Sequence, residues 1–338
     1  MLALLISLAT LTQAPAVETP ALRRFAESQR HMGVEFEVVL YAADEGTGKK
    51  ALAAAFERIA ALDRILSDYD PASELSRLSE TTPTSAPVKL SADLWTVLAS
   101  AQSWSGKSDG AFDITIGPLT KLWRRARRNR ELPTPEQLGL AREAVGYSHL
   151  QLDSNSRTAK LLRPNMRLDA GGIAKGFAAD EALAAIKKLG ITQALVRGSG
   201  DIAVGDAPPG EMGWKIGLAP LDPDDPPQHF VRIANRAVST SGDAHQHLEI
   251  DGRRYSHIID PRTGYGISGR SSVTIIAPRG IDADALASAV SVLGPEKGLV
   301  LVDKQPDAAA LIVHSKGNEA PQVFRSERLN RLAEPTGR

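Results

Sequence analysis

Residues 168–176 read LDAGGIAKG and mark the clearest change of backbone structure in the chain. The three residues before the acid, 166–168, predict a short strand that stops there. Gly171 and Gly172 can turn the backbone sharply because they lack a Cβ atom. A helix is predicted over residues 173–189, so this stretch joins a strand to a helix across one tight turn.

The same turn has the chemistry of a phosphate-binding site. The first N–H groups of a helix have no intrahelical partner and present partial positive charge to an anion. Lys175 stands in the first helical turn, where a cation opposes the helix dipole unless an anion lies beside it. The alternative is a plain glycine turn with Lys175 in solvent, and the pattern alone leaves both interpretations open.

Apolar spacing predicts the other elements on both sides of this turn. Helices are predicted at residues 50–67, 92–105 and 282–293, a loop with a short helix at 131–141, and strands at 34–41, 194–197, 213–218 and 272–277. Pro and Asp cluster at 219–228 and predict a surface loop. Helices and strands mix without a regular βαβ repeat. This indicates an α/β chain of the mixed α+β kind, with one domain over 30–325 and a loose tail over 326–338.

Composition excludes several classes of protein. The chain has 338 residues and 40 Lys+Arg against 40 Asp+Glu, so its formal net charge of zero argues against a nucleic-acid-binding protein. The absence of cysteine excludes disulfides, thiol nucleophiles and a lipid-modified cysteine. A hydrophobic fraction of 42% is ordinary for a globular protein with a sizeable core.

The first residues predict export. Residues 2–11 are mostly apolar, and Ala14-Pro15-Ala16 follows as a small-residue cleavage site, so residues 1–16 are typical of a signal peptide. The apolar run is too short to span a bilayer. No Lys or Arg precedes it, which departs from the usual signal-peptide pattern, and the alternative is an uncleaved apolar tail.

An acid and a hydroxyl in the last predicted helix have metal-ligand spacing. Asp284 and Ser288 lie at positions i and i+4, so their side chains share one helix face. Together they can bind one hard cation such as Mg²⁺, which prefers oxygen ligands. The alternative is structural: Asp284 interacts with the helix dipole and Ser288 packs against the core.

A histidine near a turn is a candidate general base. Residues 257–264 read HIIDPRTG, which begins as a strand and ends in a Pro/Gly turn. A histidine in this position can accept a proton near neutral pH, and loops on a rigid scaffold commonly carry such residues. The alternative is that His257 only forms a hydrogen bond within the turn.

Two loops combine an aromatic residue with an acid. They are residues 110–115, which read GAFDIT, and residues 67–71, which read SDYDP. Such loops can contact a flat ring and its polar edge, or the aromatic residue can anchor the turn to the core. Two further patterns favour surface structure: six basic residues within 121–130, and the alternating set Asp243, His245 and His247.

Taken together, the motifs resemble those of the ApbE family of FAD:protein FMN transferases, in the family's order. They are His31-Met32-Gly33, Tyr69 with residues 73–78, residues 110–115 with Leu119 and Trp123, residues 169–176, Ser199-Gly200-Asp201, Trp214, residues 240–243, residues 257–264 and residues 283–288. The resemblance spans roughly residues 30–303. It implies a compact fold in which mixed sheets and flanking helices enclose an FAD cleft.

The resemblance also implies site residues and partners. It places FAD contacts on Met32, Tyr69, Ala111, Phe112, Asp113, Asp169, Lys175 and Ile258, and Mg²⁺ ligands on Asp284, Ser288 and the carbonyls of Gly172 and Ala287. His257 matches the histidine that activates the acceptor hydroxyl. The implied acceptor is the Thr or Ser of an exported or membrane-attached redox protein, on the periplasmic or outer face of the membrane.

The implied reaction is attack of that hydroxyl on the FMN phosphorus of FAD, with release of AMP. Two alternatives remain: hydrolysis of FAD to FMN and AMP, and a non-catalytic flavin-binding protein. The chain departs from the family pattern at Val34, where Thr is usual, and at Ser288, where the metal-site residue is usually Thr. It also has Ser199 in place of a glycine.

Overall fold

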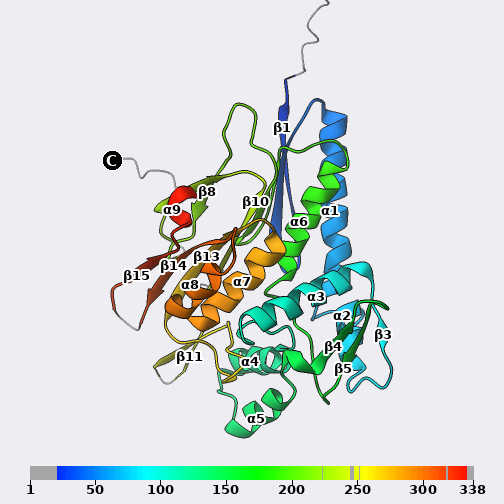
Figure 1. Cartoon of the computed structure of the whole chain (residues 1–338), viewed down its shortest axis with the longest axis vertical. Helices are drawn as coiled ribbons and strands as arrows, with labels where there is room; N and C mark the ends of the chain where they lie inside the picture. Colours follow the sequence, from blue (N-terminus) through cyan, green and yellow to red (C-terminus); the bar gives the residue numbers. More distant parts are fainter. Residues whose placement is uncertain (1–20, 223, 244–246, 251, 317–318, 333–338) are drawn as a thin grey trace, which may run out of the picture.

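The computed structural model describes residues 21–222, 224–243, 247–250, 252–316 and 319–332 (Figure 1). The predicted signal segment, 1–16, lies outside these residues. The helices are α1 (Glu45–Leu66), α2 (Glu74–Glu80), α3 (Ala92–Lys107), α4 (Gly117–Asn129), α5 (Pro135–Glu143), α6 (Ala174–Lys187), α7 (Gly280–Leu293), α8 (Pro295–Asp303) and α9 (Leu329–Leu332). None of them is long and apolar enough to cross a membrane within the part of the chain that is described.

An antiparallel sheet of eight strands organises the molecule, in the order β1-β2-β6-β7-β10-β13-β14-β15. These strands are β1 (Arg23–His31), β2 (Val34–Ala42), β6 (Ala194–Gly198), β7 (Asp201–Val204), β10 (Arg236–Gly242), β13 (Arg270–Ala277), β14 (Ala309–Ser315) and β15 (Gln322–Arg325). Smaller sheets join β3 (Val88–Lys89), β4 (Leu150–Asp153) and β5 (Thr158–Leu161), β8 (Trp214–Leu218) with β9 (His229–Ile233), and β11 (His247–Ile250) with β12 (Arg253–Ser256). The predicted mixed α+β class is confirmed.

Alternation along the strands gives the large sheet two apolar faces. In β2, Phe36, Val38 and Leu40 belong to the main core, whereas Val39 and Tyr41 contact a second cluster on the opposite face. Successive side chains of a strand point to opposite faces, so one nearly continuous apolar strand can serve two cores. Both faces of the sheet are therefore covered.

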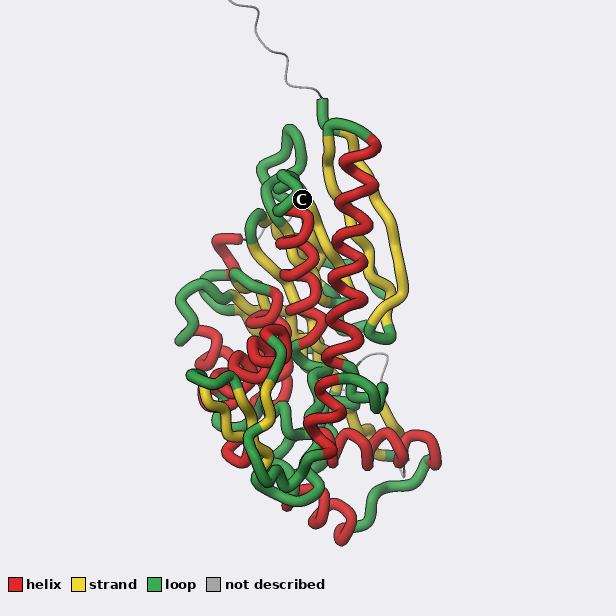
Figure 2. The backbone as a smooth tube through the Cα atoms, turned by 90° about the vertical axis from the view of Figure 1, so that its right-hand side faces the viewer, coloured by secondary structure: helices red, strands yellow, loops and turns green. Residues whose placement is uncertain are grey.

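Helices cover one face of the sheet. Figure 2 shows the long helices running alongside the strands, and α6 packs against both α1 and α7. The predicted apolar positions of α1 are buried, from Leu52 to Leu66. The helix begins at Glu45, earlier than predicted, because Asp44 accepts a hydrogen bond from the Thr47 N–H at 2.9 Å and caps it. The glycines of the first turn hid this start in the sequence.

The hairpin of β8 and β9 covers the opposite face, together with α9. Trp214, Val231 and Leu329 are buried there in one apolar cluster. The prediction of a loose tail from 326 onward is wrong for residues 326–332, because Leu329 adds to this cluster. In addition, the Ser326 hydroxyl accepts a hydrogen bond from the Ala310 N–H at 2.9 Å. Residues 333–338 lie outside the described part of the chain.

The predicted strand at 166–168 does not form. Arg167 makes only an isolated parallel bridge with Ile116. The Leu168 N–H donates to the Ser79 hydroxyl at 3.0 Å, and the Asp169 N–H donates to the Ile114 carbonyl at 2.8 Å. Loops and a helix thus take up the hydrogen bonds that a strand partner would have used. The turn and the helix after it form as predicted, with α6 beginning at Ala174.

Candidate active site

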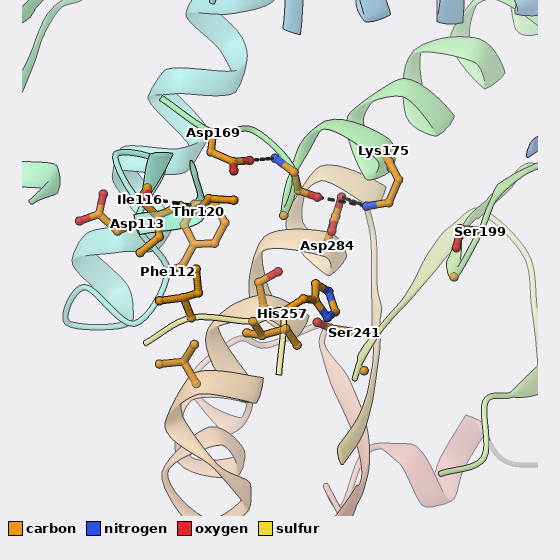
Figure 3. A pocket seen from close by; sticks show the side chains of 18 of the residues that line it. Phe112, Asp113, Ile116, Thr120, Asp169, Lys175, Ser199, Ser241, His257 and Asp284 are labelled. Carbon is orange, nitrogen blue, oxygen red and sulfur yellow. Dashed lines mark hydrogen bonds and ion pairs between the residues drawn. The ribbon is translucent and has the colours of Figure 1, made fainter. Parts of the chain in front are cut away.

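A cleft of about 380 Å³ lies where α6, α7 and α4 meet the loops 67–71, 110–116 and 257–261. Figure 3 shows its charged and aromatic side chains converging from separate elements of the fold. The predicted residues that line it are Tyr69, Ala111, Phe112, Asp113, Asp169, Gly172, Lys175, His257, Ile258, Asp284 and Ser288. The fold therefore brings together side chains that are more than 200 positions apart in sequence.

Two predicted site residues do not line this cleft. Met32 is half-buried in the turn between β1 and β2, and its N–H donates to Asp63 Oδ2 at 2.8 Å. Ala287 is fully buried within α7, and its carbonyl accepts the Ser291 hydroxyl at 2.8 Å.

The first turns of α6 and α7 hold each other through reciprocal carboxylates. Asp180 on α6 accepts the N–H groups of Gly280 and Ile281, at 2.7 and 3.0 Å, at the start of α7. Asp284 on α7 accepts the N–H of Gly176 on α6 through Oδ2 at 3.0 Å. Each helix thus supplies the acceptor for N–H groups that have no partner in their own helix.

Glycine permits this close approach. A Cβ atom on Gly176 would lie 2.1 Å from the Gly280 carbonyl oxygen, so no larger residue fits there without moving one of the helices. The two helix N-termini are therefore fixed against each other at the wall of the cleft. Side chains carried on their first turns inherit that fixed position.

Lys175 lies between two carboxylates at this wall. Its Nζ is 3.1 Å from Asp201 Oδ2 and 3.7 Å from Asp284 Oδ2, and it donates to the Gly171 carbonyl at 3.1 Å (Figure 3). Burial alone lowers the pKa of Lys175, but the charges of Asp201 and Asp284 outweigh burial and raise it. The ammonium is thus held charged, and the cation that opposed the helix dipole is compensated by the two acids.

Asp201 was predicted only as part of a motif, and the structure gives it a definite place. It is 3% exposed, and its Oδ1 accepts the Ser239 hydroxyl at 2.6 Å while Oδ2 contacts Lys175. A buried carboxylate with partners at both oxygens has a fixed orientation. Asp201 therefore holds the Lys175 ammonium in the cleft.

Asp284 and Ser288 both face the cleft, as their spacing predicted. Asp284 is 4% exposed, and burial, followed by the nearby charge of Asp201, raises its pKa to about 7. Gly172 lies so close that a Cβ atom there would be 2.7 Å from Ser288 Oγ. A carboxylate, a hydroxyl and a peptide group that line the same cleft suit a hard cation such as Mg²⁺.

Among the described residues, no group of three or more His, Cys, Asp or Glu side chains is placed to hold a metal ion. A cation in the cleft would therefore rely on one carboxylate with hydroxyl and backbone oxygens, and on oxygens of a bound ligand. The residues present fit Mg²⁺ in that manner, since this ion commonly binds through one or two carboxylates and substrate phosphates.

Asp169 fixes the glycine turn that precedes α6. Its Oδ1 accepts the Gly171 N–H at 2.8 Å, and its Oδ2 is 3.2 Å from Arg124 Nη2. The side chain is 8% exposed. Asp169 thus braces the turn from within and connects it to α4.

The loop at 67–71 presents an aromatic ring to the cleft beside α4. The Tyr69 ring is 74% exposed, and the Arg124 guanidinium lies 4.1 Å from its centroid. Arg124 also forms an ion pair with Asp68. The basic run at 121–130 predicted a solvated surface, but Arg124 and Arg127 line the cleft. The sequence does not show which arginines of this run line the cleft, because that depends on how α4 packs in the fold.

The loop at 110–115 contributes Phe112 to the cleft wall, where it is 6% exposed. Asp113 uses both oxygens within the fold: Oδ1 accepts the Thr115 N–H and hydroxyl, and Oδ2 accepts the Tyr147 N–H. Burial raises the pKa of Asp113 despite these bonds. This acid therefore braces the loop, while the aromatic ring faces the cleft.

His257 follows β12 directly and lines the cleft on the α7 side (Figure 3). Its neighbour Ile258 is fixed by its N–H to the Ser256 hydroxyl at 3.1 Å and by its carbonyl, which accepts the Ile267 N–H at 2.9 Å. The backbone that carries the imidazole is thus anchored on both sides. A proton acceptor there lies in the same cleft as Lys175 and Asp284.

Asp243, the first residue of the alternating set at 243, 245 and 247, has a structural role. Asp243 is 1% exposed, pairs with Arg254 at 3.0 Å and accepts the Ser271 N–H at 3.0 Å. His245 lies outside the described residues. The carboxylate therefore pairs with an arginine in the interior, and the prediction of a surface strand is wrong at Asp243 because its side chain is buried.

The chain is similar to proteins named as flavin transferases over most of its length. The sequence model of the ApbE family matches residues 32–312. The chain is 32% identical over 257 residues to the FAD:protein FMN transferase of Haemophilus influenzae, covering 74% of each chain. It is 31% identical over 316 residues to that of Vibrio cholerae, covering 91% of this chain and 93% of the relative. The Pseudomonas stutzeri flavinyl transferase ApbE, in its apo form, superposes with a TM-score of 0.81 and 30% identity, covering 92% of this chain and 97% of that one.

Proposed function

Because the chain belongs to the ApbE family, we propose that it is a magnesium-dependent transferase that moves FMN from FAD to a hydroxyl of another protein. Flavin transfer to protein is the activity that its relatives are named for, and the chain covers nearly the whole length of one of them. The magnesium requirement, the release of AMP and the nature of the acceptor are our own proposals for this chain.

One observation carries the proposal: a single cleft combines a charged end and an aromatic end, with a histidine along its wall. The charged end contains Lys175, Asp284 and Ser288, which suits a metal-bound diphosphate. The aromatic end contains the exposed Tyr69, which suits a flat ring, and Phe112 lines the wall beside Gly172. FAD is a ligand with a diphosphate and a tricyclic ring, so the cleft fits both of its parts.

Each residue then has a defined part in the reaction. Lys175 offsets negative charge on the diphosphate, and Asp201 holds its ammonium toward the ligand. His257 accepts the proton of the acceptor hydroxyl. The acceptor oxygen forms a bond to the FMN phosphorus, the bond from that phosphorus to the bridging oxygen breaks, and AMP leaves. Magnesium, when bound by Asp284, Ser288 and the carbonyls of Gly172 and Ala287, would further neutralise the phosphate charge.

The direct test is incubation with FAD, MgCl₂ and a threonine-containing candidate acceptor protein, followed by intact mass measurement. Transfer adds one FMN less one water to the acceptor and releases an equal amount of AMP. Free FMN and AMP with an unchanged acceptor would establish hydrolysis instead. Intact FAD that co-purifies with the chain, without either product, would establish a flavin-binding protein.

Export is the second part of the proposal. The signal-like residues 1–16 indicate that the mature chain acts on exported or membrane-attached redox proteins, on the periplasmic or outer face of the membrane. N-terminal sequencing of protein from the native host should find the chain beginning after about residue 16. An intact Met1 in a cytoplasmic fraction contradicts this.

A further inference from the structure

Arg124 makes more contacts than any surface role requires. Its Nη1 pairs with Asp68 and its Nη2 is 3.2 Å from Asp169 Oδ2, while the guanidinium plane lies 4.1 Å from the Tyr69 ring centroid. Its side chain is 21% exposed, whereas the neighbouring Arg125 on the same helix is exposed. Arg124 therefore joins three separate parts of the cleft: α4, the loop at 67–71 and the glycine turn.

Tyr69 depends on this arrangement for its orientation. The ring is 74% exposed, so the hydrophobic core does not hold it in place. The residues around it form an exposed turn, in which the Ser67 hydroxyl accepts the Asp70 N–H at 3.1 Å. The guanidinium on one face is the contact that fixes the ring and leaves its other face open to a ligand.

We propose that Arg124 is a positioning residue for the flavin ring: it holds Tyr69 as a stacking surface and sets the distance from that surface to the glycine turn at Asp169. The proposal rests on the proposed function for the identity of the ring. Its physical basis is preorganisation, since a ring that is already oriented loses little conformational freedom when the ligand stacks on it. Nothing in the motifs at 67–71 or 169–176 requires an arginine at position 124.

The alternative role for Arg124 is charge compensation alone. Asp68 and Asp169 lie close enough to raise the pKa of Asp68 through burial and mutual repulsion, and Arg124 opposes that effect. A residue that only neutralises these acids would change the stability of the cleft and would affect both ends of the ligand equally. A positioning residue would affect the ring end selectively.

Two probes separate the ends of the cleft: riboflavin, which has the ring without phosphate, and ADP with MgCl₂, which has the diphosphate without the ring. Arg124→Gln should weaken riboflavin binding about tenfold and change ADP binding by less than about twofold. Arg124→Lys keeps the charge but loses the planar fork, and it should give an intermediate loss for riboflavin. Flavin fluorescence and calorimetry measure the two affinities on the same purified protein.

A double-mutant cycle gives the decisive result. Tyr69→Ala should weaken riboflavin by a similar factor, and Arg124→Gln should add little in that background, because both changes remove one stacking surface. Independent, multiplying effects would overturn the proposal, as would equal losses for ADP and riboflavin. Arg125→Gln is the matched control and should leave both affinities unchanged.

These measurements are separate from catalysis. If the wild type transfers no FMN, the proposed function is refuted. If Arg124→Gln still loses riboflavin affinity selectively, the role of Arg124 is supported independently. Full transfer activity with riboflavin affinity unchanged in both Arg124 variants would do the reverse. Thermal unfolding of each variant verifies that the fold is retained, and Arg124→Lys supplies the result if Arg124→Gln does not fold.

Discussion

The two ends of the cleft are built on different physical principles. At the charged end, Asp284 is 4% exposed, and its Oδ2 atom contacts a backbone N–H and a lysine of a neighbouring helix. At the ring end, Tyr69 is 74% exposed and is held mainly by one guanidinium. The first end is buried and interlocked, and the second is an open surface with a single support.

This difference follows from what each end has to recognise. Charges interact strongly only where water is excluded and where their partners are already oriented, so the charged end needs rigid helix termini. A flat ring is recognised by area and stacking, which tolerate exposure on one side. We therefore expect substitutions at the charged end to abolish chemistry and substitutions at the ring end to change affinity.

The strongest test of this contrast is Asp284→Ala. Loss of the only carboxylate among the proposed metal ligands should lower transfer on the order of 10³-fold or more, with the fold intact. Initial rates with 5′-AMP detection measure the effect, after EDTA treatment and return of MgCl₂ to a roughly millimolar concentration.

Asp282→Ala is the matched control on the same helix. Asp282 pairs with Arg279 and Trp104 rather than facing the cleft, so its loss should leave the rate close to that of the wild type. An Asp284→Ala enzyme that keeps full activity in EDTA-treated buffer with trace magnesium shows that the metal assignment is wrong.

His257→Ala probes the wall between the two ends. Removal of a general base typically costs about 10² to 10⁴ in rate, and FAD affinity should be retained because Lys175 and Tyr69 remain. Transfer rate and FAD affinity are measured on the same preparation, with His229→Ala as a control on β9. Normal transfer eliminates the base assignment, whereas a histidine with only a structural role lowers stability by about 1 kcal/mol and leaves the rate per folded molecule unchanged.

Lys175→Met should have the opposite selectivity to Arg124→Gln, because it removes a contact at the charged end. Loss of a charge-assisted contact should weaken ADP binding by about 10- to 100-fold and riboflavin binding by less than about twofold. Lys175→Arg keeps a cation beside Asp201 and separates lost ligand contact from destabilisation of the acids. Lys187→Met, at an exposed position of the same helix, is the control. Equal losses for both probes would remove the distinction between the two ends.

The smallest expected effect is on the pH dependence of the free energy of unfolding, and Asp180→Asn tests it. Burial, which outweighs the hydrogen bonds from Ile281 and Gly280, raises the pKa of Asp180 to about 6 from its usual 3.8. The folded chain therefore holds this proton to a higher pH than the unfolded chain does. Its contribution to stability is complete below about pH 4 and is lost as the pH rises through about 6.

Urea unfolding at about pH 4.5 and pH 7 tests whether the contribution of Asp180 to stability falls as the pH rises. Relative to Asp180→Asn, the wild type should lose about 1–3 kcal/mol of its stability between the two pH values. A relative gain for the wild type would mean that the two amide donors favour the ionised carboxylate more than burial opposes it.

The sequence predicted the charged end better than the ring end, for physical reasons. Asp284 and Ser288 share a helix face by their spacing alone, and Lys175 was conspicuous because its charge opposed the helix dipole. Local helix geometry was therefore enough to predict these three residues. Arg124 is one of six basic residues in its run, and only the packing of α4 beside the loop at 67–71 selects it.

The failures have the same origin. Residues 166–168 are buried by loops rather than paired in a sheet, and burial alone cannot be distinguished from a strand in so short a stretch. Leu329 is one apolar residue in a polar tail, and nothing in the sequence shows the pocket that it fills beside β14 and β9.

The reciprocal carboxylates of α6 and α7 have a dynamic consequence. If the first turn of either helix opened, the other would keep a buried acid without its N–H donors, at a cost of about 1–3 kcal/mol for each such group. The two turns should therefore open only together, as one cooperative unit. In hydrogen–deuterium exchange, the amides of Gly176, Gly280 and Ile281 would then share one protection factor, and a ligand that binds at either turn would slow the exchange of all three.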